Sequence, residues 1–486
     1  MKLTGKPQPA RPGFPSLFVF LSRHGCWIQA LVPLALLVCV VARYAVDVPY
    51  LDQWELVPLL EKSYHGELTL HDLWTQHNEH RILFPQIIML ALARLTGWNI
   101  RCELAVNVIL ALGIFAVFAC QLKMTKQKLG VGSLSWAVPA VSLVVFSLSQ
   151  HQNWLWGWQL QMFLNLLAVL GGIVLLAQAT FHWRRFVAAA GLGIVATYSF
   201  ANGALFWPIG LAILFIGTAG IRERKPALIG WTLIGGLTLW SYFYHYHKPE
   251  EHPALSLIFQ MPLEYIAYVF KYIGSTCAQG VGGSRAIDGV LAFMFGVFGM
   301  VTLGWAGVML VRKQIAGFRV LLPYFAMSLY SIGSALITGV GRLGFGSNQA
   351  LASRYCTMET PLWVSLIVFL ILLVKGEAKP APEQRAGRRP FPRRHQLMAR
   401  WLLKGTIIFL VFGSMFAMVG ARNLSQQQAY GRMRLLELAM NPAAGADYNG
   451  LLLIYPRPNV IVERYPVLLE HRLSLFRIST SPADSH

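Results

Sequence analysis

Residues 47–81 read DVPYLDQWELVPLLEKSYHGELTLHDLWTQHNEHR, a polar stretch between long apolar ones. It holds seven of the chain's 21 acidic residues and four of its 13 histidines, although only 13% of the chain is charged. Carboxylates beside an apolar segment cost free energy unless they line water or meet a cation. We therefore expect this stretch to leave the membrane and carry the polar site, with the apolar remainder as its scaffold.

The composition outside this stretch is typical of a membrane protein. The 486 residues are 55% hydrophobic with a mean hydropathy of +0.51. Apolar runs of roughly 17–22 residues, the length that crosses a bilayer, recur as far as residue 420. The formal charge of +20 lies in short clusters between these runs rather than in one patch, so no nucleic-acid partner is expected. The sequence predicts an all-α polytopic membrane protein with about 11 transmembrane helices.

Basic residues before the first span predict a cytoplasmic N-terminal tail, residues 1–26, and place residues 47–102 outside as the first outer loop. Two half-apolar charged segments, 82–97 and 255–279, are expected to be interfacial helices on the outer surface. The membrane domain then covers residues 27–420. Its expected spans are 27–46, 103–122, 133–149, 160–180, 186–200, 204–220, 226–246, 287–311, 319–340, 361–374 and 401–420.

Two further segments are set apart by their composition. The Pro-rich, basic stretch 375–400 predicts a flexible cytoplasmic loop. Residues 421–486 alternate turn signals with short apolar runs, which predicts a small outer α/β piece.

In this layout 18 of the 21 acidic residues lie outside. Acids contribute little to orientation in the membrane, so their outer excess favours a functional site on that face. The expected location is a bacterial inner membrane.

Three carboxylates follow the first span closely: Asp47, Asp52 and Glu55. A carboxylate held there could act as a general base on a hydroxyl group at the membrane surface. Asp52 and Glu55 would share one face of a helix. The alternative is that these acids only solvate the loop, an interpretation that suits Asp47 better than Asp52.

The end of the same stretch, QHNEHR, places Glu79, His80 and Arg81 directly before the first interfacial helix. These residues fit a cluster that orients a substrate, and they equally fit a solvated helix cap with an interfacial arginine. The spacing is not that of an HExxH zinc motif, and two histidines do not make a metal site. No cofactor is therefore expected, although a requirement for a divalent metal ion is left as an alternative.

Candidate substrate-binding residues also occur in other outer loops. Arg342 and Arg354 flank a Gly-rich loop, and Arg285 follows a Gly-rich turn. Arginine binds phosphate through paired donors, and Gly-rich backbone adds N–H groups; interfacial anchoring is the alternative role. Trp154 belongs to a cluster of three tryptophans that would either stack on a sugar ring or anchor a span end in the aromatic belt.

The expected layout resembles the GT-C superfamily of integral membrane glycosyltransferases. The shared features are an acid shortly after the first span, outer interfacial helices and a body of many spans. LDQWE (51–55) resembles the stretch that holds the family's first-loop catalytic acid, which would fall on Asp52. HRILFPQIIMLAL (80–92) resembles the family's second interfacial helix. The chain departs from many relatives because Gln53 stands where they have a second acid. It is also similar to bacterial membrane proteins with a QHNEHR segment and an SRY loop.

The resemblance implies an inverting glycosyltransferase that passes a sugar from a polyprenyl-phosphate donor to a periplasmic glycan, lipid or protein, among membrane lipids. Asp52 would be the base, with Asp47 or Glu55 as the second carboxylate. Two other functions stay open: an O-antigen ligase or polymerase-like enzyme that uses a diphosphate donor, and a transporter or flippase of lipid-linked sugar. The residues expected to bind the substrate are Glu79, His80, Arg81, Arg285, Arg342, Arg354 and Trp154.

Overall fold

The computed structural model describes residues 17–477 except 179, 218–220, 251, 313–314, 316, 376–391 and 443–446. Within these residues the chain is helical and contains no strand, as the sequence predicts. The longer helices are α1 (Leu17–Tyr44), α4 (Leu83–Thr96), α5 (Ile100–Leu129), α6 (Ala137–Val145), α8 (Leu160–Leu176), α9 (Trp183–Thr197), α10 (Phe206–Ile216), α11 (Ile221–Phe243), α13 (Pro262–Ala278), α14 (Arg285–Arg312), α15 (Phe318–Arg342), α16 (Cys356–Lys375) and α17 (Arg393–Met440). The shorter ones are α2 (Val57–His65), α3 (Leu70–Trp74), α7 (His151–Leu155), α12 (Leu257–Gln260), α18 (Tyr448–Leu451) and α19 (Pro458–Glu470). Most of the expected N-terminal tail and of the basic loop 375–400 lies outside the described residues.

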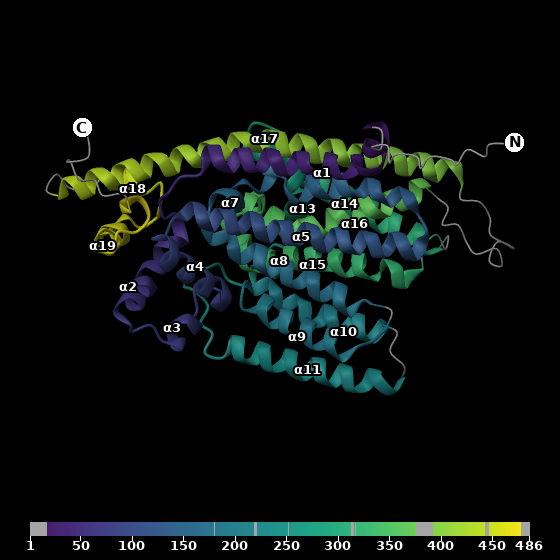
Figure 1. Cartoon of the computed structure of the whole chain (residues 1–486), viewed down its shortest axis with the longest axis horizontal. Coiled ribbons are helices and arrows are strands. Elements are labelled where there is room, and N and C mark those ends of the chain that lie inside the picture. The colour runs from purple at the N-terminus through teal and green to yellow at the C-terminus, as the bar shows by residue number, and fades with distance from the viewer. Residues whose placement is uncertain are drawn as a thin grey trace, which may run out of the picture.

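Eight helical stretches of the described chain are long and apolar enough to cross a membrane. They are Gly25–Tyr44, Ile100–Leu129, Leu134–Leu155, Gly157–Leu176, Arg285–Arg312, Phe318–Phe345, Ser353–Lys375 and Arg393–Met440. The other three expected spans are consecutive in the chain and correspond to α9, α10 and α11. The first two are short, with 15 and 11 residues, and α11 begins in the charged sequence IRERK. All three lie together along one edge of the bundle, opposite α1 and α17 (Figure 1).

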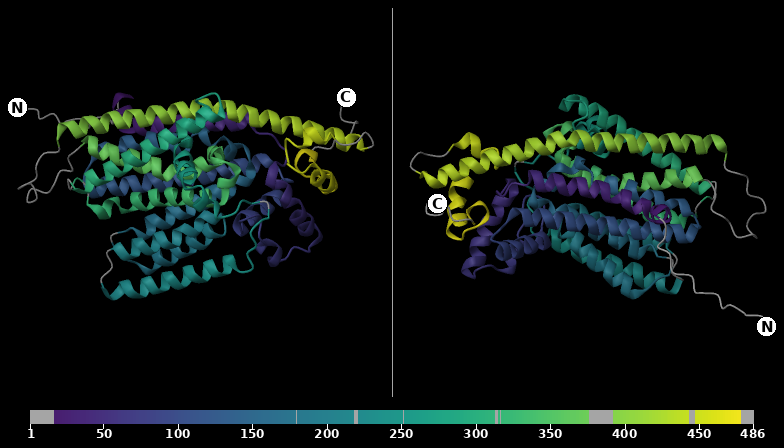
Figure 2. Two further views of the ribbon diagram at one scale, coloured as in Figure 1. Left: turned by 180° about the vertical axis from the view of Figure 1, so that it is seen from behind. Right: turned by 45° about the horizontal axis from the view of Figure 1, so that its top comes forward.

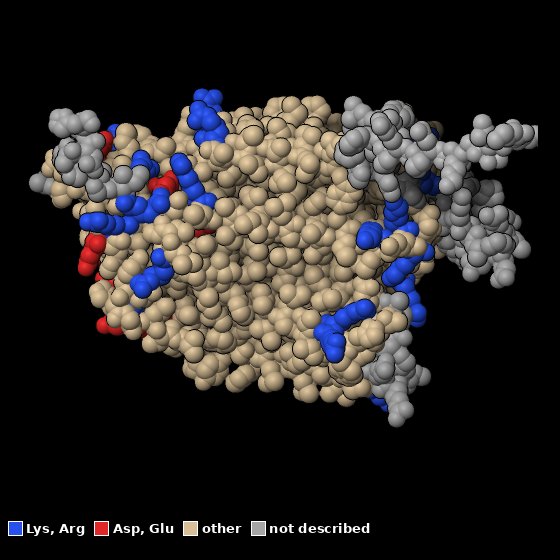
Figure 3. Space-filling model, viewed as in Figure 1, with Lys and Arg blue, Asp and Glu red and all other residues tan. Residues whose placement is uncertain are grey.

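The surface fits this arrangement. Figure 3 shows Lys, Arg, Asp and Glu at the two ends of the molecule, with a broad uncharged band between them. Apolar side chains such as Leu31, Leu36 and Met415 are more than half exposed on the band-forming helices α1 and α17. An exposed apolar band of this kind is expected where helices face lipid.

The helix α16 forms the centre of the bundle, since every residue from Cys356 to Leu373 is buried. The segment 255–279 packs against it and differs from the expected interfacial helix. It forms α12 and α13, and the last seven residues of α13, 272–278, are buried in the bundle. Gly274 permits this close approach, because an added Cβ would fall 1.9 Å from the carbonyl oxygen of Ala292 in α14.

One end of the bundle carries the first long loop, residues 45–99, and the C-terminal residues 447–477; we call it the loop end (Figure 1). The helix α17 continues 20 residues past the predicted span end at 420, and its 48 residues span about 72 Å, far more than a bilayer core. It thereby carries the C-terminal segment to the loop end, as both views of Figure 2 show. The α/β expectation for this segment is wrong, because its described part contains only helices and turns.

Candidate functional site

A cavity of about 460 Å³ lies at the loop end. Its walls come from the first loop, the turn before α8, the turn between α9 and α10, the linker after α11 and the adjoining ends of α15 and α16. Five of the ten residues that the sequence nominates line it: Asp52, Glu79, His80, Arg342 and Arg354. They come from two distant parts of the chain, residues 52–80 and 342–354, so the fold brings them together.

The short 3-10 helix η1 (Leu51–Leu56) presents Asp52 to the cavity. Trp54 and Leu56 are fully buried and fix η1 against the bundle. The backbone N–H of Leu51 donates to the carbonyl oxygen of Ile454, 2.7 Å away. Within the described chain the Asp52 carboxylate has no hydrogen-bond partner, and burial raises its pKa above the ordinary value, opposed by the nearby positive charges.

Gln53, which follows Asp52 in η1, holds this helix to the start of α5. Its Nε2 donates to Oε2 of Glu103 at 2.6 Å, and its Oε1 accepts from the backbone N–H of Tyr50 at 3.1 Å. The indole Nε1 of Trp98 donates to the other carboxylate oxygen at 2.8 Å. Glu103 is fully buried. The sequence reasoning missed Glu103, although an acid inside the apolar run 103–122 was a usable signal.

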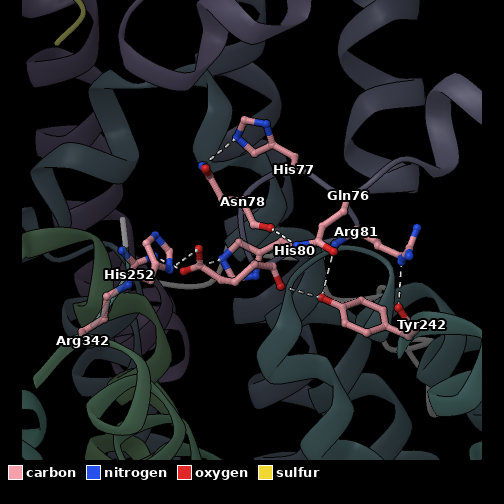
Figure 4. A network of polar contacts seen from close by, with 9 residues as sticks. Gln76, His77, Asn78, His80, Arg81, Tyr242, His252 and Arg342 are labelled. Carbon is pink, nitrogen blue, oxygen red and sulfur yellow. Dashed lines mark hydrogen bonds and ion pairs between the residues drawn. The ribbon is translucent and has the colours of Figure 1, made fainter. Parts of the chain in front are cut away.

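The QHNEHR segment folds into a tight turn that directs Glu79 into the cavity. His77 and His80 exchange two backbone hydrogen bonds of 2.8 and 2.9 Å, and Asn78 takes a positive φ of 48°, which Asn adopts more readily than most residues. The Glu79 carboxylate pairs with Arg342 and lies 3.5 Å from Nδ1 of His252 (Figure 4).

The two histidines of this turn are buried beside the cavity. Burial lowers the pKa of His80 to about 3. Burial also lowers the pKa of His77, although Asp52 opposes the shift. Both imidazoles are therefore neutral near pH 7, and they serve the cavity as hydrogen-bonding groups rather than as cations.

Arg354 brings a positive charge into the cavity. Its backbone is fixed by Gln152 and Asn153, which contact its N–H and C=O at 3.2 and 2.8 Å. The guanidinium lies 5.2 Å from the ring centroid of Tyr355, and no acidic side chain of the described residues pairs with it. Arg342 differs, because Glu79 already neutralises it.

Arg81 lies next to the turn but does not line the cavity. Its guanidinium donates to the carbonyl oxygens of Trp74, Tyr242 and Tyr244 at 2.6 to 2.7 Å. Figure 4 shows it directed to Tyr242 and away from Arg342. Arg81 therefore ties the first loop to the linker after α11, and we leave it out of the candidate site.

Asp47 and Glu55 also lie outside the cavity and are engaged by the C-terminal segment. Asp47 pairs with Arg477 and accepts the backbone N–H of Ile100 at 3.0 Å. Glu55 accepts hydrogen bonds from Tyr455 and, at 2.9 Å, from Arg464. Burial alone would raise the pKa of Glu55, but these hydrogen bonds lower it below its ordinary value. Neither acid is placed to meet a substrate together with Asp52.

Two other nominated residues do not reach the cavity. Arg285 is exposed at the start of α14, and the N–H groups of the Gly-rich turn before it donate to Asp288 instead of an external anion. Trp154 is buried, with its indole N–H donating to the carbonyl oxygen of Ser147 at 2.8 Å. Its neighbours Trp156 and Trp158 are the tryptophans that line the cavity.

Several polar atoms of the cavity wall have no hydrogen-bond partner among the described residues. They are Nε1 of Trp156, Oε1 of Gln159, Oε1 of Gln161, Nδ2 of Asn202 and Nδ1 of His80. Buried polar groups in proteins are nearly always hydrogen-bonded, so this wall is suited to water or to a ligand rich in hydroxyl groups. In the part of the chain described, no three His, Cys, Asp or Glu side chains gather to hold a metal ion.

Comparisons with protein-family models, curated proteins and solved structures find no match for this chain. Its function is therefore argued from the geometry of the cavity.

Proposed function

We propose that this chain is a membrane glycosyltransferase of the GT-C type, which transfers a sugar from a polyprenyl-phosphate donor to an acceptor hydroxyl on a glycan, lipid or protein. The loop end would face the periplasm, with the basic segments near the opposite end in the cytoplasm. Inversion of the anomeric centre follows from a single displacement with one base.

One observation carries the proposal: the cavity holds a carboxylate and a guanidinium that are not joined in an ion pair. Asp52 and Arg354 both line the cavity and attract each other electrostatically, but their side chains are not close enough to form an ion pair. Partly buried charges that form no ion pair reduce stability, and such groups are concentrated at sites where a ligand interacts with them. A polyprenyl-phosphate sugar fits both charges: its phosphate group would lie near Arg354, and its anomeric carbon would lie near Asp52, where the acceptor hydroxyl attacks.

The proposed reaction is one displacement. Asp52 takes the proton of the acceptor hydroxyl while its oxygen forms the bond to the anomeric carbon. The bond from that carbon to the phosphate oxygen breaks, and polyprenyl phosphate leaves with the electron pair. Arg354 offsets the negative charge that develops on the leaving group. Arg342 contributes less to this charge stabilisation while it is paired with Glu79. If that ion pair breaks, His80 and His252 are close enough to contact the Glu79 carboxylate.

Other residues of the cavity wall suit a sugar. Trp156 and Trp158 supply aromatic surface, and the unpartnered atoms of Gln159, Gln161 and Asn202 supply donors and acceptors. Such a wall would fix the orientation of the ring, because each hydroxyl group that pairs with it removes the cost of a buried unsatisfied group.

The test uses purified full-length protein in lipid nanodiscs with a panel of undecaprenyl-phosphate hexoses and pentoses, and a membrane extract as acceptor. Asp52→Asn should abolish transfer while the donor still binds. Arg354→Gln should weaken donor binding, with a KM raised about ten- to a hundredfold, as expected for loss of a charged hydrogen bond. Glu61→Gln and Arg285→Gln, exposed residues outside the cavity, are the matched controls.

Full activity of Asp52→Asn would refute the role of the base. Movement of labelled lipid-linked sugar across the bilayer, with no glycosyl product in any assay, would replace the proposal by a flippase. Reaction only with diphosphate-linked donors would replace it by a ligase or polymerase-like enzyme.

A further inference from the structure

A second pocket, of about 390 Å³, lies at the loop end and shares no lining residue with the cavity. The end of α1, the start of α5, the outward extension of α17 and the C-terminal segment form its walls. Its charged lining residues are Asp47, Arg101, Arg432 and Arg477.

Positive charge exceeds negative charge in this pocket. Arg477 is neutralised by Asp47. Arg101 and Arg432 have neither an ion pair nor a side-chain hydrogen bond within the described chain, and Arg432 is partly buried. Two guanidinium groups beside one already neutralised pair leave a net charge of about +2, which favours an anion, and guanidinium groups bind phosphate oxygens through paired donors.

The position of the pocket indicates where the anion comes from. It lies where α1 ends at Tyr44 and α5 begins at Ile100, so its floor is formed by the ends of two apolar helices. Basic side chains gather at this end beside α17, next to the uncharged band (Figure 3). Lipid head groups lie at this level of a bilayer, and an arginine there can reach a phosphate while its stem stays in apolar surroundings.

We propose that this pocket binds an anionic phosphate group at the membrane surface, through Arg101 and Arg432. Arg477 also lines the pocket, but it is already paired with Asp47. The ligand chemistry is common to the head group of an acidic phospholipid and to free phosphate. The proposal does not depend on glycosyl transfer, and it is tested without that activity.

The experiment is native mass spectrometry of the full-length protein, released from nanodiscs of phosphatidylglycerol or of zwitterionic phosphatidylcholine. The wild type should retain phosphatidylglycerol preferentially. The double variant Arg101→Gln/Arg432→Gln should lose that preference, with the apparent dissociation constant raised at least about tenfold. Arg422→Gln, an exposed arginine on the same helix α17 that does not line the pocket, should bind as the wild type does.

A titration with inorganic phosphate in neutral detergent separates the two sources. Binding that the double variant loses in this titration, without any preference for phosphatidylglycerol, assigns the pocket to a soluble phosphate. Equal retention of both lipids, and equal phosphate binding, by the wild type and the double variant would overturn the proposal. An unchanged thermal unfolding midpoint in the double variant shows that lost binding is not lost folding; if the midpoint falls, the single variant Arg432→Gln carries the same test.

Discussion

Gly157→Ala tests the contact on which the position of Asp52 depends. Gly157 lies between the two tryptophans of the cavity wall, and it packs against the carboxylate that holds η1. An alanine Cβ at this position would fall 2.0 Å from Oε2 of Glu103 and 2.9 Å from Nε2 of Gln53. Side-chain carbons do not approach other heavy atoms closer than 3.0 Å, so the Glu103 side chain would have to move by roughly 1 Å.

The size of the effect follows from the contacts that this movement breaks. Glu103 accepts hydrogen bonds of 2.6 and 2.8 Å from Gln53 and Trp98, and it is fully buried. Hydrogen bonds to a charged group contribute about 1.5–3 kcal/mol each, and overpacking costs about 1–3 kcal/mol. Since relaxation would keep part of both bonds, we expect the free energy of unfolding to fall by about 2–4 kcal/mol.

The assay is an SDS titration of unfolding, followed by tryptophan fluorescence, with glycosyl transfer measured on the same samples. Gly191→Ala is the matched control: Gly191 lies within α9 and a Cβ there meets nothing within 4 Å, so alanine should stabilise the protein by about 0.5–1 kcal/mol. An unfolding midpoint for Gly157→Ala equal to that of the control, with full transfer, would refute the reasoning.

Three other predictions concern the loop end. Because burial raises the pKa of Asp52, its contribution to stability is greatest below pH 3.8 and is lost as the pH rises through the raised pKa. Asp52→Asn should therefore unfold at a higher temperature than the wild type near pH 7 and not near pH 3, and equal midpoints at both would contradict this. Arg464→Met should loosen the C-terminal segment 447–477 from Glu55, seen as faster limited proteolysis there at a cost of about 1 kcal/mol; unchanged cleavage would argue against the clamp. Arg81→Lys should lower the free energy of unfolding in SDS by about 2–3 kcal/mol, because an ammonium group cannot reach three carbonyl oxygens, and a loss below about 0.5 kcal/mol would count against it.

The helical layout could be predicted because a bilayer sets it. A helix that crosses the apolar core needs about 20 apolar residues, a pattern visible in the sequence alone. The prediction failed where other contacts replace lipid. The segment 255–279 carries charges, yet its second half is buried because α14 offers it a close helical surface. The helix α17 continues past residue 420 because it gains contacts at the loop end rather than an apolar environment.

The candidate site could be predicted in part for a similar reason. Asp52, Glu79 and Arg354 are charges in or beside apolar surroundings, and their cost is visible from sequence. The same argument nominated Asp47 and Glu55, whose arginine partners lie more than 400 residues further along the chain. Contacts at that separation have no local signal, so the sequence alone does not distinguish an acid that anchors the C-terminal segment from one that lines the cavity.

The exchange of Gln53 and Glu103 tests whether this pair replaces the second acid that follows the base in many GT-C enzymes. Gln53→Glu alone would place two buried carboxylates at a contact that is now 2.6 Å, and like charges at that distance oppose each other strongly. Glu103→Gln alone removes the charge that strengthens both hydrogen bonds. In the double variant Gln53→Glu/Glu103→Gln, the new amide on α5 would donate to the new carboxylate on η1 and accept from Trp98. That carboxylate would still accept from the backbone N–H of Tyr50, so the bond between the two exchanged side chains is remade with its direction reversed.

The double variant should therefore recover most of the stability and transfer lost by either single variant, with a coupling energy of about 1–3 kcal/mol. Gln53 lies in η1 and Glu103 contacts it there, so a role limited to holding Asp52 in place predicts recovery in both measurements. Recovery of stability without recovery of transfer would mean that the charge at position 103 itself acts on the reaction. Additive losses in both measurements would mean that the two side chains do not form the unit inferred from their contact.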